Sequence, residues 1–499
     1  MAYDYRPVDR DQGFLIPPDI REWLDRDHVV WFVLDAVARM DTTAFHRPRR
    51  GRTNPASAAG KRGYDPDLLL VLLIYAYAVG ERSSRRIERL CQTDVAFRVL
   101  CGNDIPDHTV IARFRRDHDT AFVDLFTAVL MLCQAAGMGR FGQVALDGTK
   151  IAANAAKSRT RSETALRNTA RDITDDAYRV DHAEETATRR GDHHDQDRMP
   201  PGLRSDGARS AAIEKALARI EERKAADTAG DDALAAARVR ADRTRAKFER
   251  LDAEHRARTL AWQTRVDAGD RRPGPRPVPT EQNVTVQKAK AVADRAKAAH
   301  ENLLVPAEAG GRGRTYRANL TDPESALMKT RGGFIQGYNA QLVASDDHLI
   351  IAADLTDDPT DPGWYRPMVT AATDTITQLW GGDTEIGCVL ADAGYCSQSN
   401  LTAPGPDRLI ATGSRRSTGP RRAESVELAA MRARLATDAG RAAYKRRGAV
   451  IEPINAHLKD RRGLRTFSRR GLVAAKAELH LAAAVTNLLR LFTTGPQLA

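Results

Sequence analysis

Two short apolar segments lie far apart in the chain, and each ends in an aspartate. The first is Gln143-Val-Ala-Leu-Asp147, and the second is Ile386-Gly-Cys-Val-Leu-Ala-Asp392. Apolar runs of this length favour buried strands. A carboxylate at the tip of such a strand, followed closely by glycine, lies at a sheet edge where the backbone of a substrate can approach. The two segments therefore predict a sheet that carries a pair of acids.

The surrounding residues supply further strands and helices. Segments 337–344 and 349–355, joined by a turn at 345–347, predict a hairpin. Residues 364–380 have a helical pattern, and 408–411 form a short strand-like run. The order of strand, long insertion, hairpin, helix, strand and helix predicts an α/β fold around a mixed sheet.

The first 140 residues are expected to form an all-helical domain. Apolar residues recur at helical spacing over 23–40 and 68–79. Over 83–118 the pattern predicts three short helices, with Ser83 as the first N-cap. The last of them carries Arg113, Arg115 and Arg116. This arrangement fits a helix-turn-helix-like DNA-binding module, and an ordinary small helical bundle fits the pattern equally well.

Residues 157–307 have a different character. They are rich in Ala, Arg, Glu and Asp, with a proline-rich break at 271–277. The pattern predicts a charged, partly mobile helical insertion with little core of its own. It would split a core made of residues 141–156 and 308–475, and a C-terminal helix would occupy 476–499.

The balance of charge points to a polyanionic partner. The net charge is +11, and residues 412–476 alone carry 17 basic and 5 acidic side chains. A stretch this unbalanced favours a phosphate backbone. The longest apolar run, 68–79, has 12 residues, short of the roughly 20 that cross a bilayer. We therefore expect no membrane span, and the N-terminus has no pattern of a secretory signal.

The five scattered cysteines lack zinc-binding spacings, which favours reduced thiols in a cytoplasmic protein. Oxygen ligands suit Mg²⁺, which is held by few carboxylates together with phosphate. Two such ions roughly 4 Å apart can activate a water or a 3′-hydroxyl and stabilise the leaving oxygen. Asp147 and Asp392 are therefore candidate metal ligands.

A third acid, Glu452, lies in the segment that runs from Tyr444 through Arg446 and Arg447 to Lys459. The proline that follows it predicts that Glu452 stands at the N-terminal end of a helix. A helix-capping role explains Glu452 alone but not the flanking Tyr, Arg and Lys. A competing acidic cluster follows the predicted hairpin and comprises Asp354, Asp357, Asp358 and Asp361.

With these motifs, nearly the whole chain resembles the insertion-sequence transposases of the DDE class. It is similar to the group with a Tyr–Arg–Glu–Lys signature on a ribonuclease H-like core. The resemblance is carried by residues 82–89, 106–115, 147–150, 327–341 and 391–395 and by the Glu452 segment. It implies that Asp147, Asp392 and Glu452 bind the catalytic metal ions, two Mg²⁺ with Mn²⁺ as a substitute.

The resemblance also implies that Tyr444, Arg447 and Lys459 hold the transposon end. Four residues separate Arg447 from Glu452 where the signature has three, so Arg446 is an alternative for the arginine. The implied partners are the terminal inverted repeats and target DNA, bound by a homodimer. The implied location is the bacterial cytoplasm, on the nucleoid when DNA is bound.

The implied reaction is Mg²⁺-dependent cleavage at the transposon ends and strand transfer into target DNA. Two rivals stay open on the sequence. One is a DNA-binding protein derived from a transposase that has lost catalysis, and the other is a structure-specific DNA nuclease without strand transfer.

Overall fold

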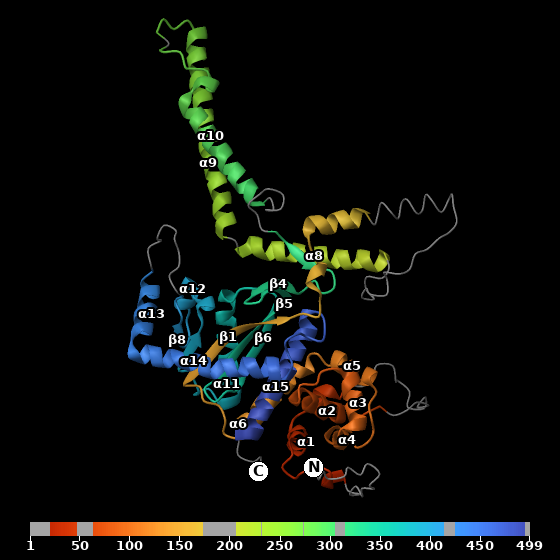
Figure 1. Ribbon diagram of the computed structural model, residues 1–499. Coiled ribbons are helices and arrows are strands. Elements are labelled where there is room, and N and C mark those ends of the chain that lie inside the picture. The colour runs from red at the N-terminus through yellow and green to blue at the C-terminus, as the bar shows by residue number, and fades with distance from the viewer. Residues whose placement is uncertain are drawn as a thin grey trace, which may run out of the picture. The chain divides into compact units, whose positions relative to one another are not determined.

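The computed structural model describes residues 20–46, 63–172, 206–230, 232–272, 274–304, 315–413 and 425–494. The chain divides into two compact units (Figure 1). The main unit comprises Met1–Lys157 and Glu324–Ala499, and the inserted unit comprises Ser158–Pro323. Each is described by itself.

A six-stranded mixed sheet lies at the centre of the main unit. Its strands are β1 (Gln143–Ala152), β4 (Ala326–Thr330), β5 (Gly333–Ser345), β6 (Ile350–Thr356), β7 (Cys388–Ala391) and β8 (Asp407–Ile410). The order is β4-β5-β1-β7-β8, with β6 also paired to β5. The strand β1 is antiparallel to β5 and parallel to β7. The predicted strands and the mixed α/β class are confirmed.

The strand β1 differs from its prediction because it does not end at Asp147. It continues to Ala152, since β5 stays paired with it from Val144 to Ala152. The parallel neighbour β7 stops at Ala391, opposite Leu146. Asp147 therefore lies inside a strand, at the level where the adjacent strand ends.

The region before the sheet is helical, as expected. Its helices are α1 (Val29–Arg39), α2 (Pro66–Ala78), α3 (Ser84–Thr93), α4 (Val95–Cys101), α5 (His108–Asp117) and α6 (Ala121–Ala135). Helix α2 is buried along most of its length. Ser83 stands at the N-cap of α3, but its side chain makes no capping bond. Glu81 accepts hydrogen bonds from the backbone N–H groups of Arg82 and Ser83 instead.

The remaining helices of the main unit follow β6. They are α11 (Tyr365–Trp380), α12 (Gln398–Leu401), α13 (Val426–Ala436), α14 (Asp438–Ala456) and α15 (Leu472–Thr494). Short 3-10 turns are η1 (Ile20–Glu22), η2 (Thr43–Phe45), η9 (Pro362–Trp364) and η10 (Ala393–Tyr395). Helix α15 packs against α2, α6 and β6. By length and composition it could span a membrane, and 78% of its apolar window is buried within the protein.

Helix α14 corrects the expectation for Glu452. Thr437 caps the helix, which begins at Asp438, so Glu452 and Pro453 lie in its second half rather than at its N-terminal end. A proline inside a helix removes one backbone donor. The helix continues past Pro453 only to Ala456, and a π-helical turn, His457–Arg461, follows.

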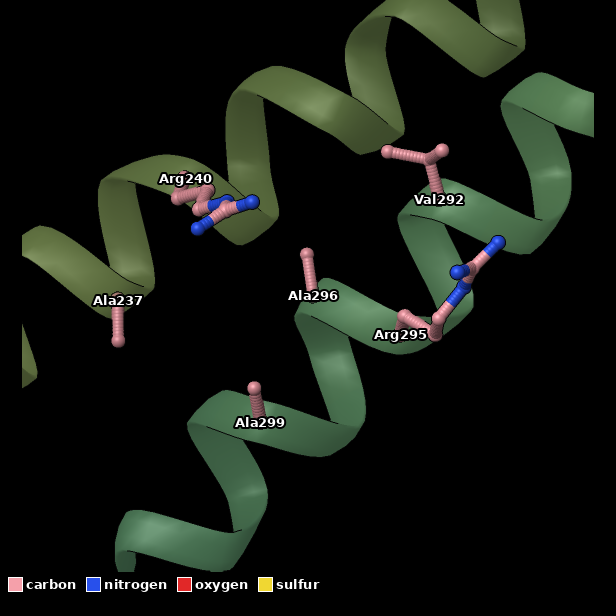
Figure 2. Close-up of a pocket in the computed structure, with 6 residues that line it drawn as sticks. All are labelled: Ala237, Arg240, Val292, Arg295, Ala296 and Ala299. Carbon is pink, nitrogen blue, oxygen red and sulfur yellow. The ribbon is translucent and has the colours of Figure 1, made fainter.

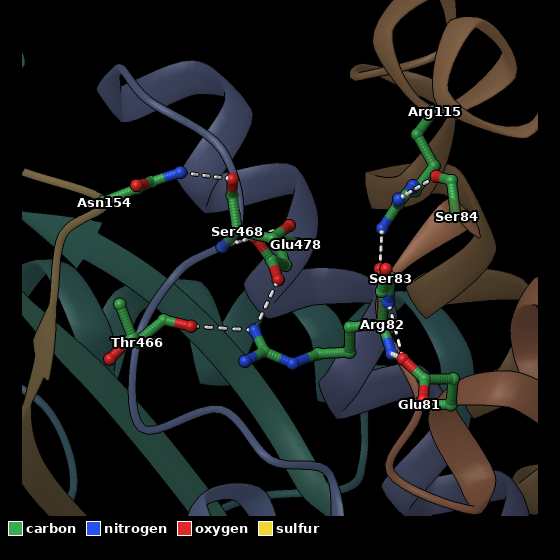
Figure 3. A network of polar contacts seen from close by, with 9 residues as sticks. All are labelled: Glu81, Arg82, Ser83, Ser84, Arg115, Asn154, Thr466, Ser468 and Glu478. Atoms are coloured by element: carbon green, nitrogen blue, oxygen red, sulfur yellow. Dashed lines mark hydrogen bonds and ion pairs between the residues drawn. The ribbon is translucent and has the colours of Figure 1, made fainter. Parts of the chain in front are cut away.

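A polar network ties the helical region to the sheet (Figure 3). The Arg82 guanidinium donates to the carbonyl of Thr466 at 2.8 Å and to Glu478 Oε1 at 2.6 Å. The other oxygen of Glu478 accepts from the backbone N–H of Ser468, whose carbonyl accepts from Asn154 beyond β1. Arg82 therefore joins the loop before α3 to α15 and the end of β1.

The inserted unit is mainly helical. Its elements are η4 (Lys157–Arg159), β2 (Thr160–Ser162), α8 (Asp206–Gly230), α9 (Asp232–Asp267), η7 (Thr280–Gln282), α10 (Val284–Leu304) and β3 (Arg317–Asn319). A small core contains Leu166, Ile213, Ala216, Ile220 and Ala318. Helices α9 and α10 pack together, with the predicted proline-rich break between them. Alanines facing each other leave a hollow between these helices, flanked by Arg240 and Arg295 (Figure 2).

Candidate active site

The sheet register places Asp147 beside Asp392. Leu146 on β1 is opposite Ala391 on the parallel strand β7, so the two following residues are the aspartates. The chain turns away after Ala391, and Asp392 Oδ1 accepts from the backbone N–H of Gly394 at 2.8 Å. Two acids more than 200 residues apart in the sequence are thereby neighbours in the fold.

Arg447 of α14 contacts both aspartates. Its Nη2 lies 2.5 Å from Asp147 Oδ1 and 3.9 Å from Asp392 Oδ2. The side chains of Arg447 and Asp147 are only 14% and 16% exposed, so this is a largely buried ion pair. From the same helix, Asn455 Nδ2 donates to Asp147 Oδ2 at 2.7 Å. Helix α14, which packs against β1, β5 and β7, therefore covers the acids.

Tyr444 and Lys459 lie near the same acids. Burial raises the pKa of the Tyr444 hydroxyl, Arg447 lowers it, and the charges of Asp392 and Asp147 raise it. Burial lowers the pKa of the Lys459 amine, as does Arg465, whereas Asp147 raises it. Each of these side chains is thus close enough to interact with at least one carboxylate of the pair.

A third carboxylate, Asp361, lies beside the pair. Its Oδ1 accepts from Asn339 Nδ2 at 2.7 Å and from Gln341 Nε2 at 3.0 Å. A Cβ added to Gly394 would lie 2.9 Å from both Asp361 Oδ2 and Asp392 Oδ1, so the two carboxylates flank that glycine. The sequence offered one signal for this position, the acidic cluster after the hairpin.

The environment makes Asp147 a weaker acid than an exposed aspartate. Burial raises its pKa from 3.8 to about 6, Arg447 lowers it, and Asp392 raises it. The hydrogen bond from Asn455 lowers the pKa and the charge of Asp361 raises it. Desolvation and like charges thus outweigh the arginine, as expected for a crowded carboxylate site.

Glu452 is exposed and lies on the same helix as Arg447 and Asn455. A Cβ added to Gly448 would meet its Oε1 at 3.3 Å. Residues three apart on a helix are neighbours on its surface, so Glu452 adjoins Asn455, which contacts Asp147. Within the described part of the chain, the Glu452 carboxylate forms no ion pair with another residue. It is near the site without touching either aspartate.

The other predicted DNA contacts lie in different surroundings. Arg446 pairs with Asp346 at 2.6 Å and not with the acids of the site. Arg113 and Arg116 of α5 are exposed, and Arg116 pairs with Asp117. Arg115 is buried, and its guanidinium donates to the carbonyl of Arg82 and to Ser84 Oγ (Figure 3). The Arg115 guanidinium is therefore engaged within the helical region.

The donors around Asp147 suit a hard divalent cation. The site contains the carboxylates of Asp147, Asp392 and Asp361. It also contains the amide oxygens of Asn339 and Asn455, and each of these two oxygens is buried without a hydrogen-bond partner. Oxygen ligands of these kinds are the ones that Mg²⁺ takes. An orphaned buried acceptor is costly unless another group satisfies it. The residues present therefore fit a metal ion.

The guanidinium of Arg447 lies between the two aspartates in this arrangement. The acids of this site do not yet form a group of three ligand atoms within 4.8 Å of one another. Among the described residues, the groups that do so are His46 with Asp65 and Asp67, and Glu88 with Asp107 and His108. A cation at Asp147 and Asp392 therefore requires Arg447 to withdraw and the carboxylates to approach each other.

Comparison with known protein families finds a match at each end of the chain. Residues 18–117 match the model described as transposase domain (DUF772), which spans α1 to α5. Residues 406–492 match the transposase DDE domain, which includes Arg447, Glu452 and Lys459. No curated protein and no solved structure matches the chain.

The two matches agree with each other, since each describes a part of a transposase, and they flank the acidic site described above. The family processes DNA and generally uses divalent metal ions. DNA is accordingly the partner on which the chain acts. With a transposase domain before the sheet and a DDE domain after it, the chain is an insertion-sequence transposase of the DDE class.

Proposed function

We propose that this transposase cleaves DNA at the transposon ends and joins the freed ends to target DNA with two Mg²⁺ ions held by Asp147, Asp392 and Glu452. The observation that carries the proposal is the placement of Asp147 beside Asp392 under helix α14, which bears Arg447 and Glu452 and is followed by the turn that bears Lys459. Mn²⁺ is expected to substitute, because it also takes oxygen ligands.

We further propose a ribonuclease H-like core. Three antiparallel strands, β6, β5 and β1, are followed in the sheet by the parallel strands β7 and β8. This order supports the assignment, as does the position of the acids on β1 and directly after β7. For the remaining domains we propose the arrangement that the sequence predicts. Residues 1–140 bind DNA through a helix-turn-helix-like module around 83–118, and residues 157–307 form an insertion between the two parts of the core.

Each residue has a separate task in the proposed reaction. When bound, the metal ions activate the attacking hydroxyl and stabilise the leaving oxygen of an in-line displacement. Asp147, Asp392 and Glu452 hold the ions, and the half-buried Lys459 and Tyr444 hold the phosphate next to the scissile bond. Asn455 fixes the rotamer of Asp147. The attacking hydroxyl belongs to water in cleavage and to the 3′ end in strand transfer.

Between the two candidates for the signature arginine, we favour Arg447. Its guanidinium is 2.5 Å from Asp147, whereas Arg446 pairs with Asp346. Arg447 neutralises the acids before the metal binds. Once a cation replaces it there, the guanidinium is free to bind a phosphate of the transposon end. A homodimer, one subunit at each transposon end, is part of the proposal.

The test compares the wild type with Asp147→Ala, Asp392→Ala and Glu452→Ala on labelled transposon ends in Mg²⁺. We expect all three variants to lose nicking while retaining end binding. Nicking by Asp392→Ala would contradict the proposal. A wild type that binds but never nicks would indicate the inactive DNA-binding protein. Nicking without joining of labelled ends to a target plasmid would indicate a nuclease.

A further inference from the structure

We propose that Asp361 is a fourth metal-binding carboxylate of this site and holds a divalent ion together with Asp392. The inference rests on the proposed function for the presence of the metal and adds a ligand to it. Asp361 follows β6 in the chain and is half-buried. The argument depends on what holds its side chain in place.

Asp361 occupies a helix-capping position without capping the helix. It precedes the turn η9, but its side chain makes no bond to the backbone of that turn. An aspartate at such a position ordinarily accepts from the backbone N–H groups that follow. The carboxylate instead points to the sheet, where Asn339 and Gln341 donate to it. Capping therefore does not explain why an acid stands here.

Two buried amides in the centre of the sheet fix this carboxylate. Asn339 and Gln341 have no exposed surface and alternate on β5, so they point to the same face. The Tyr395 hydroxyl donates to Gln341 Oε1, which leaves the Gln341 amide to donate to Asp361. Burying amides is unfavourable unless they are hydrogen-bonded. Their common task is to orient the acid.

One atom of this assembly lacks a partner. Asn339 Oδ1 is buried and accepts no hydrogen bond, although Nδ2 of the same amide donates to Asp361 at 2.7 Å. A buried acceptor without a protein partner, next to a carboxylate, is a place where another polar group can bind. A cation at Asp361, or water bound to that cation, would satisfy this oxygen.

The two glycines that follow the paired aspartates leave room for Asp361. A Cβ on Gly148 would collide with Asp361 Oδ1, and one on Gly394 would lie 2.9 Å from Asp361 Oδ2. Neither glycine has a positive φ, so backbone conformation does not require glycine at either position. Both motifs, Asp147-Gly and Asp392-Ala-Gly, are thus shaped to admit a third carboxylate.

The charges around Asp361 favour a cation. Three carboxylates, those of Asp147, Asp392 and Asp361, lie close to one another, and the Arg447 guanidinium contacts the first two. Neighbouring like charges repel each other more strongly in a partly dehydrated site than in water. A divalent ion between Asp361 and Asp392 relieves that repulsion.

The test measures Mn²⁺ binding to the full chain without DNA, from the electron paramagnetic resonance signal of free Mn²⁺. Asp361→Asn removes the charge but can still accept from Asn339 and Gln341, so the fold is expected to persist. We expect the Kd for Mn²⁺ to rise about 10- to 100-fold. The matched control is Asp374→Asn, an exposed acid of α11, which should bind Mn²⁺ as the wild type does.

A second variant tests ligation directly. In Asp361→Cys a thiolate replaces the carboxylate, and soft ligands prefer soft metals. The ratio of Cd²⁺ to Mn²⁺ affinity should therefore rise at least tenfold over the wild type, which a purely structural residue would not cause. An unchanged ratio would overturn the inference.

Mn²⁺ binding to two variants distinguishes a failure of this inference from a failure of the proposed function. If Asp361→Asn binds Mn²⁺ normally while Asp392→Asn does not, Asp361 is no ligand and the three-acid site stands. If both variants bind Mn²⁺ as the wild type does, the metal site itself is misplaced, and both proposals fall.

Discussion

At the scale of single residues, Arg447 determines the state of the site. Its guanidinium is the cation that lies between Asp147 and Asp392, and both its side chain and that of Asp147 are largely buried. Its neighbour Arg446 makes a more exposed pair with Asp346. Two adjacent arginines thus differ mainly in burial, which makes them a matched pair for experiment.

Arg447→Ala should lower the free energy of unfolding by about 3–5 kcal/mol without metal, because it leaves buried carboxylates uncompensated. Arg446→Ala should lower it by less than about 1 kcal/mol. Added Mg²⁺ should stabilise Arg447→Ala more than the wild type, where the ion must displace the guanidinium. Denaturant unfolding with and without Mg²⁺ measures both effects. Equal losses in the two variants would contradict this account.

Asp147 predicts a pH effect on the metal-free protein. Burial raises its pKa from 3.8 to about 6, so the folded state binds this proton more tightly than the unfolded state. Protonation of Asp147 therefore stabilises the folded state fully below pH 3.8, and this stabilisation is lost as the pH rises through 6. The expected loss is on the order of 3 kcal/mol at most.

Asp147→Asn cannot titrate and should lack this decline. Unfolding midpoints at several pH values between 4 and 7, compared with those of Asp374→Asn, test the expectation. A decline of the same size in Asp147→Asn would assign the effect to another group.

The residues of the site differ in how far the sequence reveals them. Asp147 and Asp392 follow apolar strands, a local pattern that can be recognised without a structure. Asn455 has no such pattern, and the sequence marks Asp361 only as one member of an acidic cluster, because both residues reach the site only through helix packing and strand register. Asn339 and Gln341 are polar residues of the predicted strand 337–344, and the sequence does not identify Asp361 as their partner.

At the scale of elements, the ion pair of Arg82 and Glu478 couples the helical region to the sheet (Figure 3). The Glu478 side chain is 1% exposed, so Arg82→Ala leaves an unpaired buried carboxylate and should cost about 3–5 kcal/mol. Arg86→Ala, which breaks a pair in which the arginine is exposed, should cost under about 1 kcal/mol. Thermal unfolding of both variants measures the difference. Similar melting temperatures would show that this contact does not couple the two regions.

Two arginines of helix α5 are expected to have different roles, Arg113 in DNA recognition and Arg115 in stability. Arg113→Ala should keep the wild-type melting temperature and weaken discrimination of the terminal repeat from random DNA, if this helix enters a groove. Arg115→Ala should instead lower the melting temperature, since its guanidinium bonds the Arg82 carbonyl and Ser84. Competition binding and thermal unfolding distinguish these outcomes. Loss of stability in Arg113→Ala would reverse the assignment.

Two element boundaries were mispredicted for physical reasons. The strand β1 runs beyond Asp147 because β5 continues to pair with it, and such pairing is not visible in local sequence. Pro453 suggested a helix start, but Thr437 and Asp438 provide a better one 15 residues earlier. Long-range strand pairing and competing helix caps therefore limit how well the sequence predicts where an element begins and ends. Apolar periodicity, in contrast, located the helices.

At the scale of the whole molecule, the two units differ in how well their helices are covered. Helix α15 is buried over most of its length, whereas α9 has exposed Val239 and Leu260 and little buried surface. Helices with few buried contacts open locally at low free energy. Backbone amides of α9 and α10 should therefore exchange with deuterium much faster than those of α15 and β1. Mass spectrometry of the native protein measures this, and equal protection would contradict it.

The insertion also has a consequence for synthesis. Asp147 meets its strand partner Leu342 only after some 195 further residues have been added, about 10 to 40 s of translation. Helix α14 is made later still. During that delay Asp147 has been made, whereas its partner strand β5, Asp392 and Arg447 have not. A nascent chain arrested before Asp438 lacks the helix that carries Arg447 and Glu452, so under the proposed function nicking is expected to begin only after the last helices have been made.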